Sequence, residues 1–230
     1  MQRVFKVTRF HMRDSRNALV IFYLIVAAVL ALFMHISQSQ NARMSGLGLA
    51  SLIFIFIAGL DCFSTAFRFM QANNVSRRYF FFGTSLSLFM IAALMASVDA
   101  AMNVGLRQLF VYKGLFQQLY PVGSPLVDFC WSLSLFAFAA HLGWLITMVY
   151  YRSNPLMRTL VSVSPVLVIM LFLNISLGRN LAPRIIHWFA KMLGLMGTPR
   201  PFVAIGSFLL ATLLAAAGSW LLLRRATVRG

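Results

Sequence analysis

Residues 126–151 read LVDFCWSLSLFAFAAHLGWLITMVYY, and Asp128 is the only charged side chain in this run. A helix needs roughly 20 mostly apolar residues to cross the hydrocarbon core of a bilayer. The run is long enough and apolar enough to cross as one helix. We therefore predict that it spans a membrane.

Further apolar runs of similar length occur on both sides of this one, at residues 18–36, 47–66, 79–101, 160–177 and 202–223. The first run lies too far from the N-terminus to be a cleaved signal sequence. The composition agrees, with 60% hydrophobic and 10% charged residues, against about 25% charged residues in soluble domains. The sequence predicts an all-α membrane protein in which residues 1–230 form one domain of six transmembrane helices.

The basic residues between these runs predict the orientation of the chain. Of the 20 Lys and Arg residues, 13 fall in the N-terminal, second, fourth and C-terminal flanks, and 7 fall in the alternate connections. Basic residues accumulate on the cytoplasmic side of membrane proteins. We therefore expect both termini in the cytoplasm.

Residues 2–16 form an amphipathic pattern at helical spacing. Basic residues fall on one arc of the helical wheel, and Val4, Phe5, Val7 and Met12 fall on the opposite arc. We predict a separate helix in the cytoplasmic membrane interface. Residues 181–196 repeat the pattern and predict an amphipathic outer helix, with a stop at Gly197 and Pro199.

The connection at residues 102–125 is long and partly apolar. We expect a short outer helix at about residues 106–119. The alternative is that residues 109–119 extend a span.

The chain contains four acidic residues and no glutamate, which removes several chemistries. The acids are Asp14, Asp61, Asp99 and Asp128, and no phosphate-binding G-x-x-x-x-G-K-S/T run is present. Glutamate-dependent metalloproteases are excluded, and so is nucleotide hydrolysis by a P-loop of this chain. Scattered histidines predict no metal site. We expect that the chain is not an enzyme and itself binds no cofactor.

The net charge of +16 would also suit a nucleic-acid-binding protein. The basic residues lie between apolar runs, however, so anionic lipids are the expected counter-ions and no nucleic-acid partner is predicted. Cys62 and Cys130 fall toward opposite faces of the bilayer. They are expected to remain unpaired thiols.

Polar residues within the spans have two interpretations each. Asp61 either pairs with Arg68 on the same helical face or belongs to an inner gate. His141 is either a hydrogen-bonded core residue or a substrate contact. Asp99 and Asp128 are expected to pair with Arg107 or Lys113. Because no carboxylate falls in the middle of a span, energy for any transport is expected to come from a partner.

Small residues recur every fourth position on the last span, at Ser207, Ala211, Ala215 and Ser219. Such faces allow close packing of helices in lipid. The partner helix can belong to the same chain or to a second copy.

Residues 67–81 read FRFMQANNVSRRYFF, and charge counting places them on the cytoplasmic side between the second and third spans. The stretch resembles small bacterial permeases of ABC-2 type ATP-binding-cassette transporters. In those permeases a phenylalanine-rich helix end is followed by Gly-Val or Gly-Ile, then Ser-Arg and aromatic residues. Asn74 stands where glycine is expected, and asparagine tolerates left-handed backbone angles.

The resemblance implies a multi-pass permease subunit of the bacterial cytoplasmic membrane. A separate ATPase subunit, which binds ATP and Mg, would dock on a coupling segment at about residues 67–78. A second permease chain, identical or similar, would complete the transport path. The expected function is export of an amphipathic peptide, lipid or drug-like substrate. The coupling residues it implies are Gln71, Asn73, Asn74, Val75, Ser76, Arg77 and Arg78.

Two other functions remain open on the sequence alone. The chain could be the substrate-capture subunit of an energy-coupling-factor importer, which also uses separate ATPases. It could also be a membrane immunity or accessory protein that transports nothing. Arg77 and Arg78 could then simply anchor the loop to anionic lipid.

Overall fold

The computed structural model describes residues 2–37, 44–109, 112–120, 124–154, 159, 182–196 and 199–224. The protein is all-α, apart from a two-residue parallel pairing of β1 (Met44–Ser45) with β2 (Tyr112–Lys113). The described residues include five helical stretches long and apolar enough to cross a membrane: Gln2–His35, Leu47–Ala72, Arg77–Gln108, Pro125–Arg152 and Pro201–Arg224. The chain is therefore a multi-pass membrane protein by helix length and hydropathy.

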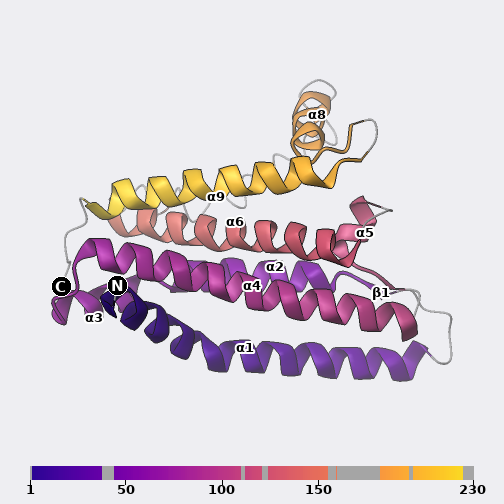
Figure 1. Ribbon diagram of the computed structural model, residues 1–230, viewed down its shortest axis with the longest axis horizontal. Helices are drawn as coiled ribbons and strands as arrows, with labels where there is room; N and C mark the ends of the chain where they lie inside the picture. The colour runs from indigo at the N-terminus through magenta and orange to yellow at the C-terminus, as the bar shows by residue number, and fades with distance from the viewer. Residues whose placement is uncertain are drawn as a thin grey trace.

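The long helices lie side by side in a bundle (Figure 1). Helix α6 (Pro125–Arg152) lies in the middle and packs against α2 (Leu47–Asp61), α4 (Arg77–Leu109) and α9 (Pro201–Arg224). Helix α1 (Gln2–Ser37) packs mainly on α4. The start of α1 and the end of α9 lie at one end of the bundle, together with α3 (Ser64–Ala72). We call this end the basic end because most of the described Lys and Arg residues lie there.

Outward-facing apolar side chains cover α1 and α9. Leu213 is 67% exposed, and Leu24, Leu32, Leu210 and Leu221 are also exposed. A soluble protein rarely exposes so much contiguous apolar surface. Lipid accounts for this surface in a membrane protein.

Helices α2 and α6 approach until their backbones touch. A Cβ atom on Gly59 would overlap the carbonyl oxygen of Ala140, and one on Gly143 would overlap that of Phe56. The Thr147 hydroxyl donates a hydrogen bond to the carbonyl oxygen of Leu60, 2.6 Å away. Only glycine permits so close a crossing at these two positions.

The small residues of α9 face the neighbouring helices of the same chain. Ala215 and Ser219 are buried, while Ser207 and Ala211 are half-buried. The Ser207 hydroxyl donates to the carbonyl oxygen of Met192 at 3.0 Å. Packing within one chain therefore accounts for the spacing of these four residues.

The structure corrects the prediction of separate helices at residues 2–16 and 18–36. Helix α1 is continuous from Gln2 to Ser37 and bends in its first half (Figure 1). No glycine or proline interrupts this stretch, so nothing in it stops a helix. The buried face also differs, because Val7, Thr8 and His11 are buried while Phe5 is 64% exposed.

The second and third predicted spans have different bounds from those observed. Helix α2 ends at Asp61, and α3 follows after a break at Cys62 and Phe63. The predicted helix at residues 106–119 is wrong, because α4 continues to Leu109 and α5 (Leu115–Leu119) is a separate short helix after β2. Both cysteines are free.

The predicted outer helix at residues 181–196 is shorter in the structure. Helix α8 (Ala182–Met192) ends in a turn in which Gly194 adopts φ 61°. The Leu195 amide donates to the Ala190 carbonyl at 2.8 Å, which is the hydrogen bond that closes a Schellman motif. The stop is therefore Gly194 and not Gly197 and Pro199. The predicted span at residues 160–177 lies outside the described residues.

Candidate functional site

Helix α3 is the first part of the predicted coupling segment. It buries Ala66, Phe67 and Met70 and exposes Arg68 and Phe69, with Phe69 50% exposed. An aromatic cluster holds the buried side, in which the Phe67 ring lies 5.4 Å from Phe80 and 5.0 Å from Phe63, measured between centroids. Such ring pairs add stability beyond the area that they bury. The buried side of α3 is therefore tightly packed against the bundle.

The turn after α3 is a Schellman motif centred on Asn74. Asn74 has φ 56°, which is the left-handed conformation. The Val75 amide donates to the Met70 carbonyl at 3.0 Å, and the Asn74 amide donates to the Gln71 carbonyl at 3.0 Å. The Gln71 side-chain amide donates to the Val75 carbonyl at 2.9 Å. Asparagine thus occupies the left-handed position of this turn, which is most often glycine.

Arg77 and Arg78 begin α4 but have different surroundings. Arg77 is half-buried, and its Nη1 atom donates to the carbonyl oxygen of Arg224 at 2.7 Å. Arg77 therefore supports the end of α9. Arg78 is exposed and has no hydrogen-bond or ion-pair partner among the residues that the structure describes. Of the two, Arg78 is free to contact a partner.

The first half of α1 packs against α3 and the start of α4. The ring of Phe10 stacks on Phe69 with centroids 5.3 Å apart. The Thr8 hydroxyl lies 3.1 Å from the carbonyl oxygen of Gly83, and His11 Nε2 lies 3.1 Å from Thr84 Oγ1. The N-terminal helix, α3 and the start of α4 therefore form one packed unit at the basic end.

His141 lies inside the bundle on α6. It is 2% exposed, with Nε2 2.9 Å from Ser85 Oγ and Nδ1 2.8 Å from the carbonyl oxygen of Ala137. Both ring nitrogens thus have partners within the chain. This geometry matches a hydrogen-bonded core histidine.

Asp61 is exposed at the end of α2 and does not pair with Arg68. The prediction of that ion pair is wrong, because the break at Cys62 and Phe63 removes the continuous helical face that the two would share. Asp61 lines a cavity of about 510 Å³ between α1 and α2, together with His11 and Asp14.

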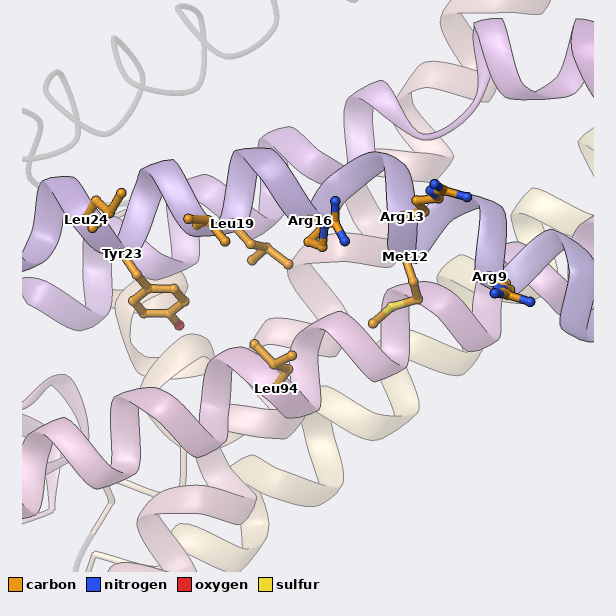
Figure 2. Close-up of a pocket in the computed structure, with 9 residues that line it drawn as sticks. Arg9, Met12, Arg13, Arg16, Leu19, Tyr23, Leu24 and Leu94 are labelled. Atoms are coloured by element: carbon orange, nitrogen blue, oxygen red, sulfur yellow. The ribbon is translucent and has the colours of Figure 1, made fainter.

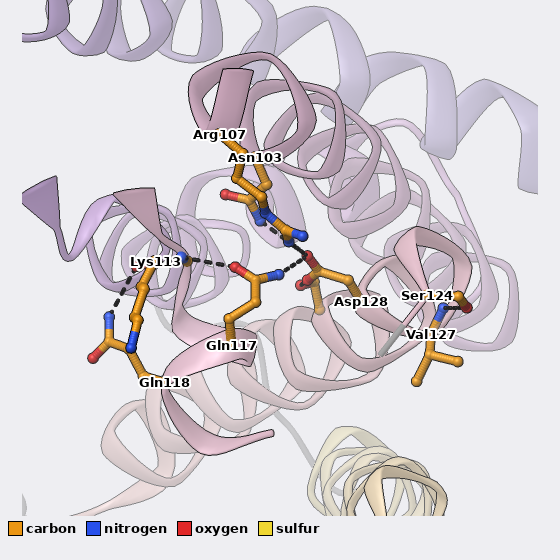
Figure 3. Close-up of polar contacts among 10 residues, drawn as sticks. Asn103, Arg107, Lys113, Gln117, Gln118, Ser124, Val127 and Asp128 are labelled. Atoms are coloured by element: carbon orange, nitrogen blue, oxygen red, sulfur yellow. Dashed lines mark hydrogen bonds and ion pairs between the residues drawn. The ribbon is translucent and has the colours of Figure 1, made fainter. Parts of the chain in front are cut away.

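Asp128 is the centre of a polar cluster at the opposite end of the bundle (Figure 3). It is 2% exposed, and its Oδ2 atom accepts from Gln117 at 2.7 Å, Asn103 at 3.2 Å and Arg107 at 3.4 Å. The predicted pairing of Asp128 with Arg107 is confirmed. Ser132 adds a hydrogen bond to Oδ1 at 3.4 Å.

Asp99 does not pair with Arg107 or Lys113. Its Oδ1 atom accepts from the Tyr23 hydroxyl at 3.3 Å, and its buried Oδ2 atom has no hydrogen-bond partner among the described side chains and backbone. Nearby, burial raises the pKa of Tyr112 in β2 to about 12.

Sequence reasoning missed four residues of these clusters: Tyr23, Asn103, Gln117 and Ser132. Asn103 lies four residues before Arg107, which places the two on one face of a helix. That spacing was a usable signal. Tyr23 and Gln117 come from other elements and carry no such signal.

The described residues contain no group of three or more His, Cys or Asp side chains that could hold a metal ion. The chain matches none of the known protein families, curated proteins or solved structures with which it was compared. The case for function therefore rests on the residues and their geometry.

Proposed function

We propose that the chain is the permease subunit of an ATP-binding-cassette transporter of the ABC-2 type. The observation that carries this proposal is the surface formed by α3, the Asn74 turn and the start of α4, where the second described membrane-spanning stretch ends and the third begins. This surface presents Phe69, Asn73 and Arg78 outward on a tightly packed base. A rigid base with an exposed apolar and cationic surface suits a docking site for a separate subunit.

The proposed mechanism needs a rigid link between the docking surface and the spans. The Phe10 to Phe69 stack ties α3 to α1, and the hydrogen bond from Arg77 to the Arg224 carbonyl ties the start of α4 to the end of α9. Movement of the docking segment by an ATPase would therefore be transmitted to both outer helices of the bundle. ATP and Mg would bind to the ATPase alone.

Two such permease chains, identical or similar, would enclose a path in the bacterial cytoplasmic membrane. The exposed apolar faces of α1 and α9 provide surface for such a second chain. The substrate class that we propose is an amphipathic peptide, lipid or drug-like molecule, and the direction is export.

The test is co-purification of the tagged chain from its own membranes, followed by identification of bound ATPases by mass spectrometry. We expect an ATP-binding-cassette ATPase with the unaltered chain and at least a tenfold lower yield with Arg78→Glu. Charge reversal opposite acidic partner residues costs several kcal/mol, which is ample for such a loss.

Arg152→Glu is the matched control. Arg152 is an exposed arginine at the same end of the bundle, in α6 and outside the docking segment. The control should retain the ATPase. Equal recovery of the ATPase with both variants would remove the docking segment from the interface, and recovery of no such ATPase would contradict the proposed function.

A further inference from the structure

A cleft of about 870 Å³ opens between α1 and α4 on the outside of the bundle (Figure 2). Its wall on α1 carries Arg9, Arg13 and Arg16, followed by the apolar side chains of Leu19 and Leu24, and Leu94 of α4 lies across from them. Clefts that hold small molecules typically measure about 300–1,000 Å³. The cleft is therefore large enough for a ligand.

Hydrogen bonds join α1 to α4 near both ends of the cleft. Near the start of α1, the Thr8 hydroxyl bonds to the carbonyl oxygen of Gly83. Further along, the Tyr23 hydroxyl bonds to Asp99. Between these two contacts, the described residues that line the cleft all belong to α1 and α4.

The three arginines share one side of α1 because they are spaced four and three residues apart. All three are exposed, and none forms an ion pair with a residue in the described ranges. No carboxylate lines the cleft. Asp14, the one acid on this part of α1, lines the cavity on the side of α2 instead. The three guanidinium groups are therefore available to bind an anion from outside the chain.

The polar and apolar parts of the cleft are ordered along the helix. Arg16 is the last charged residue of α1, since residues 17–34 contain none. From Arg16 to Leu24 the wall extends about 12 Å along the axis. A ligand that fills the cleft must carry negative charge at the end nearer the basic end and hydrocarbon beyond it.

We propose that this cleft binds an anionic phospholipid from the leaflet next to the basic end. Its phosphate contacts Arg9, Arg13 and Arg16, and an acyl chain lies against the exposed side chains of Val20, Leu24 and Leu94. Guanidinium groups bind phosphate oxygens in bidentate geometry. The acyl chain packs against the aliphatic part of the wall, as it would against other lipid chains, so the charge contacts provide the selectivity.

The experiment is native mass spectrometry of the purified chain in detergent, titrated with phosphatidylglycerol or phosphatidylcholine. We expect phosphatidylglycerol to bind at least tenfold more tightly. The triple variant Arg9→Gln, Arg13→Gln, Arg16→Gln should lose about tenfold or more of this affinity, because three charge contacts are removed. The matched control is Arg3→Gln, Lys6→Gln, Arg68→Gln, which removes the same charge outside the cleft and should keep the affinity within about threefold.

A second variant, Leu94→Trp, tests the apolar part without a change of charge. It should fill the space between α1 and α4 and lower phosphatidylglycerol affinity, while inorganic phosphate should compete poorly with the lipid. Equal binding of both lipids, or equal loss in the control, overturns the proposal. Strong competition by inorganic phosphate indicates a plain anion site and also overturns it. Cleft variants that abolish dimer formation and leave lipid binding unchanged would also overturn the proposal.

Discussion

The two ends of the helix bundle treat their carboxylates in opposite ways. At the end that holds β1, β2 and α5, Asp128 is buried and accepts hydrogen bonds from Asn103, Gln117 and Arg107. At the basic end, Asp14 and Asp61 are exposed and form no ion pair with any described residue. One end uses Asp128 to hold structure, while Asp14 and Asp61 at the other end are open to their surroundings.

The difference indicates where external partners bind. The cluster around Asp128 satisfies its charge within the chain and joins three elements. The basic end carries a large excess of positive charge that the described acids do not neutralise, at residues Arg3, Lys6, Arg9, Arg13, Arg16, Arg68, Arg77, Arg78, Arg152 and Arg224. Lipid phosphates and an acidic protein surface are natural counter-ions for such an end.

The largest expected effect is the loss of Asp128. Asp128→Ala leaves the partly buried Asn103 and Gln117 without this acceptor, and a hydrogen bond to a charged group contributes about 1.5–3 kcal/mol. We expect the free energy of unfolding to fall by about 3 kcal/mol and the unfolding midpoint to fall by about 10 °C. Tryptophan fluorescence of the purified protein in detergent, heated at a constant rate, measures this midpoint.

Asp128→Asn is the matched control for this prediction. Its side-chain oxygen still accepts hydrogen bonds, while the ion pair with the partly exposed Arg107 is lost. An ion pair of this kind contributes little, up to about 1 kcal/mol. The asparagine variant should therefore lose less than half as much stability as the alanine variant. If both variants have the same unfolding midpoint as the unaltered chain, the Asp128 cluster does not stabilise this end of the bundle.

A smaller effect is expected at the Asn74 turn of the basic end. A β-branched residue resists φ 56°, so Asn74→Val should reduce the free energy of unfolding by about 1–2 kcal/mol. Asn74→Gly accepts this angle and should leave stability within about 0.5 kcal/mol. The same thermal measurement compares the two. Equal unfolding midpoints for valine and glycine would show that the turn does not constrain this end.

The sequence predicts the spans well where strong signals bound an apolar run. The predicted runs at 126–151 and 202–223 match α6 (Pro125–Arg152) and α9 (Pro201–Arg224) to within one residue, because proline precedes and arginine follows each run. The continuity of α1 was readable from its lack of glycine and proline. The break at Cys62 and Phe63 carries no such signal, because tertiary contacts of the phenylalanine cluster decide it.

The candidate residues divide in the same way. The Asn74 turn follows from local backbone preference, which a short sequence expresses. Arg107 was one of two predicted ion-pair partners of Asp128. The sequence could not choose between Arg107 and Lys113, because both carry the same charge. Gln117 and Tyr23 reach their carboxylates from separate elements. Such partners depend on the three-dimensional arrangement and could not be predicted from one sequence.

The smallest expected change in the free energy of unfolding is at Asp61. This residue therefore contrasts with Asp128, where the largest change is expected. Asp61 is exposed at the last position of α2, where a carboxylate meets the negative end of the helix dipole. Asp61→Ala should therefore leave the free energy of unfolding unchanged or raise it by up to about 0.5 kcal/mol. The fluorescence measurement used for Asp128→Ala gives the direct comparison. A loss as large as that of Asp128→Ala would mean that Asp61 has a structural partner, and the contrast between the two ends would then fail.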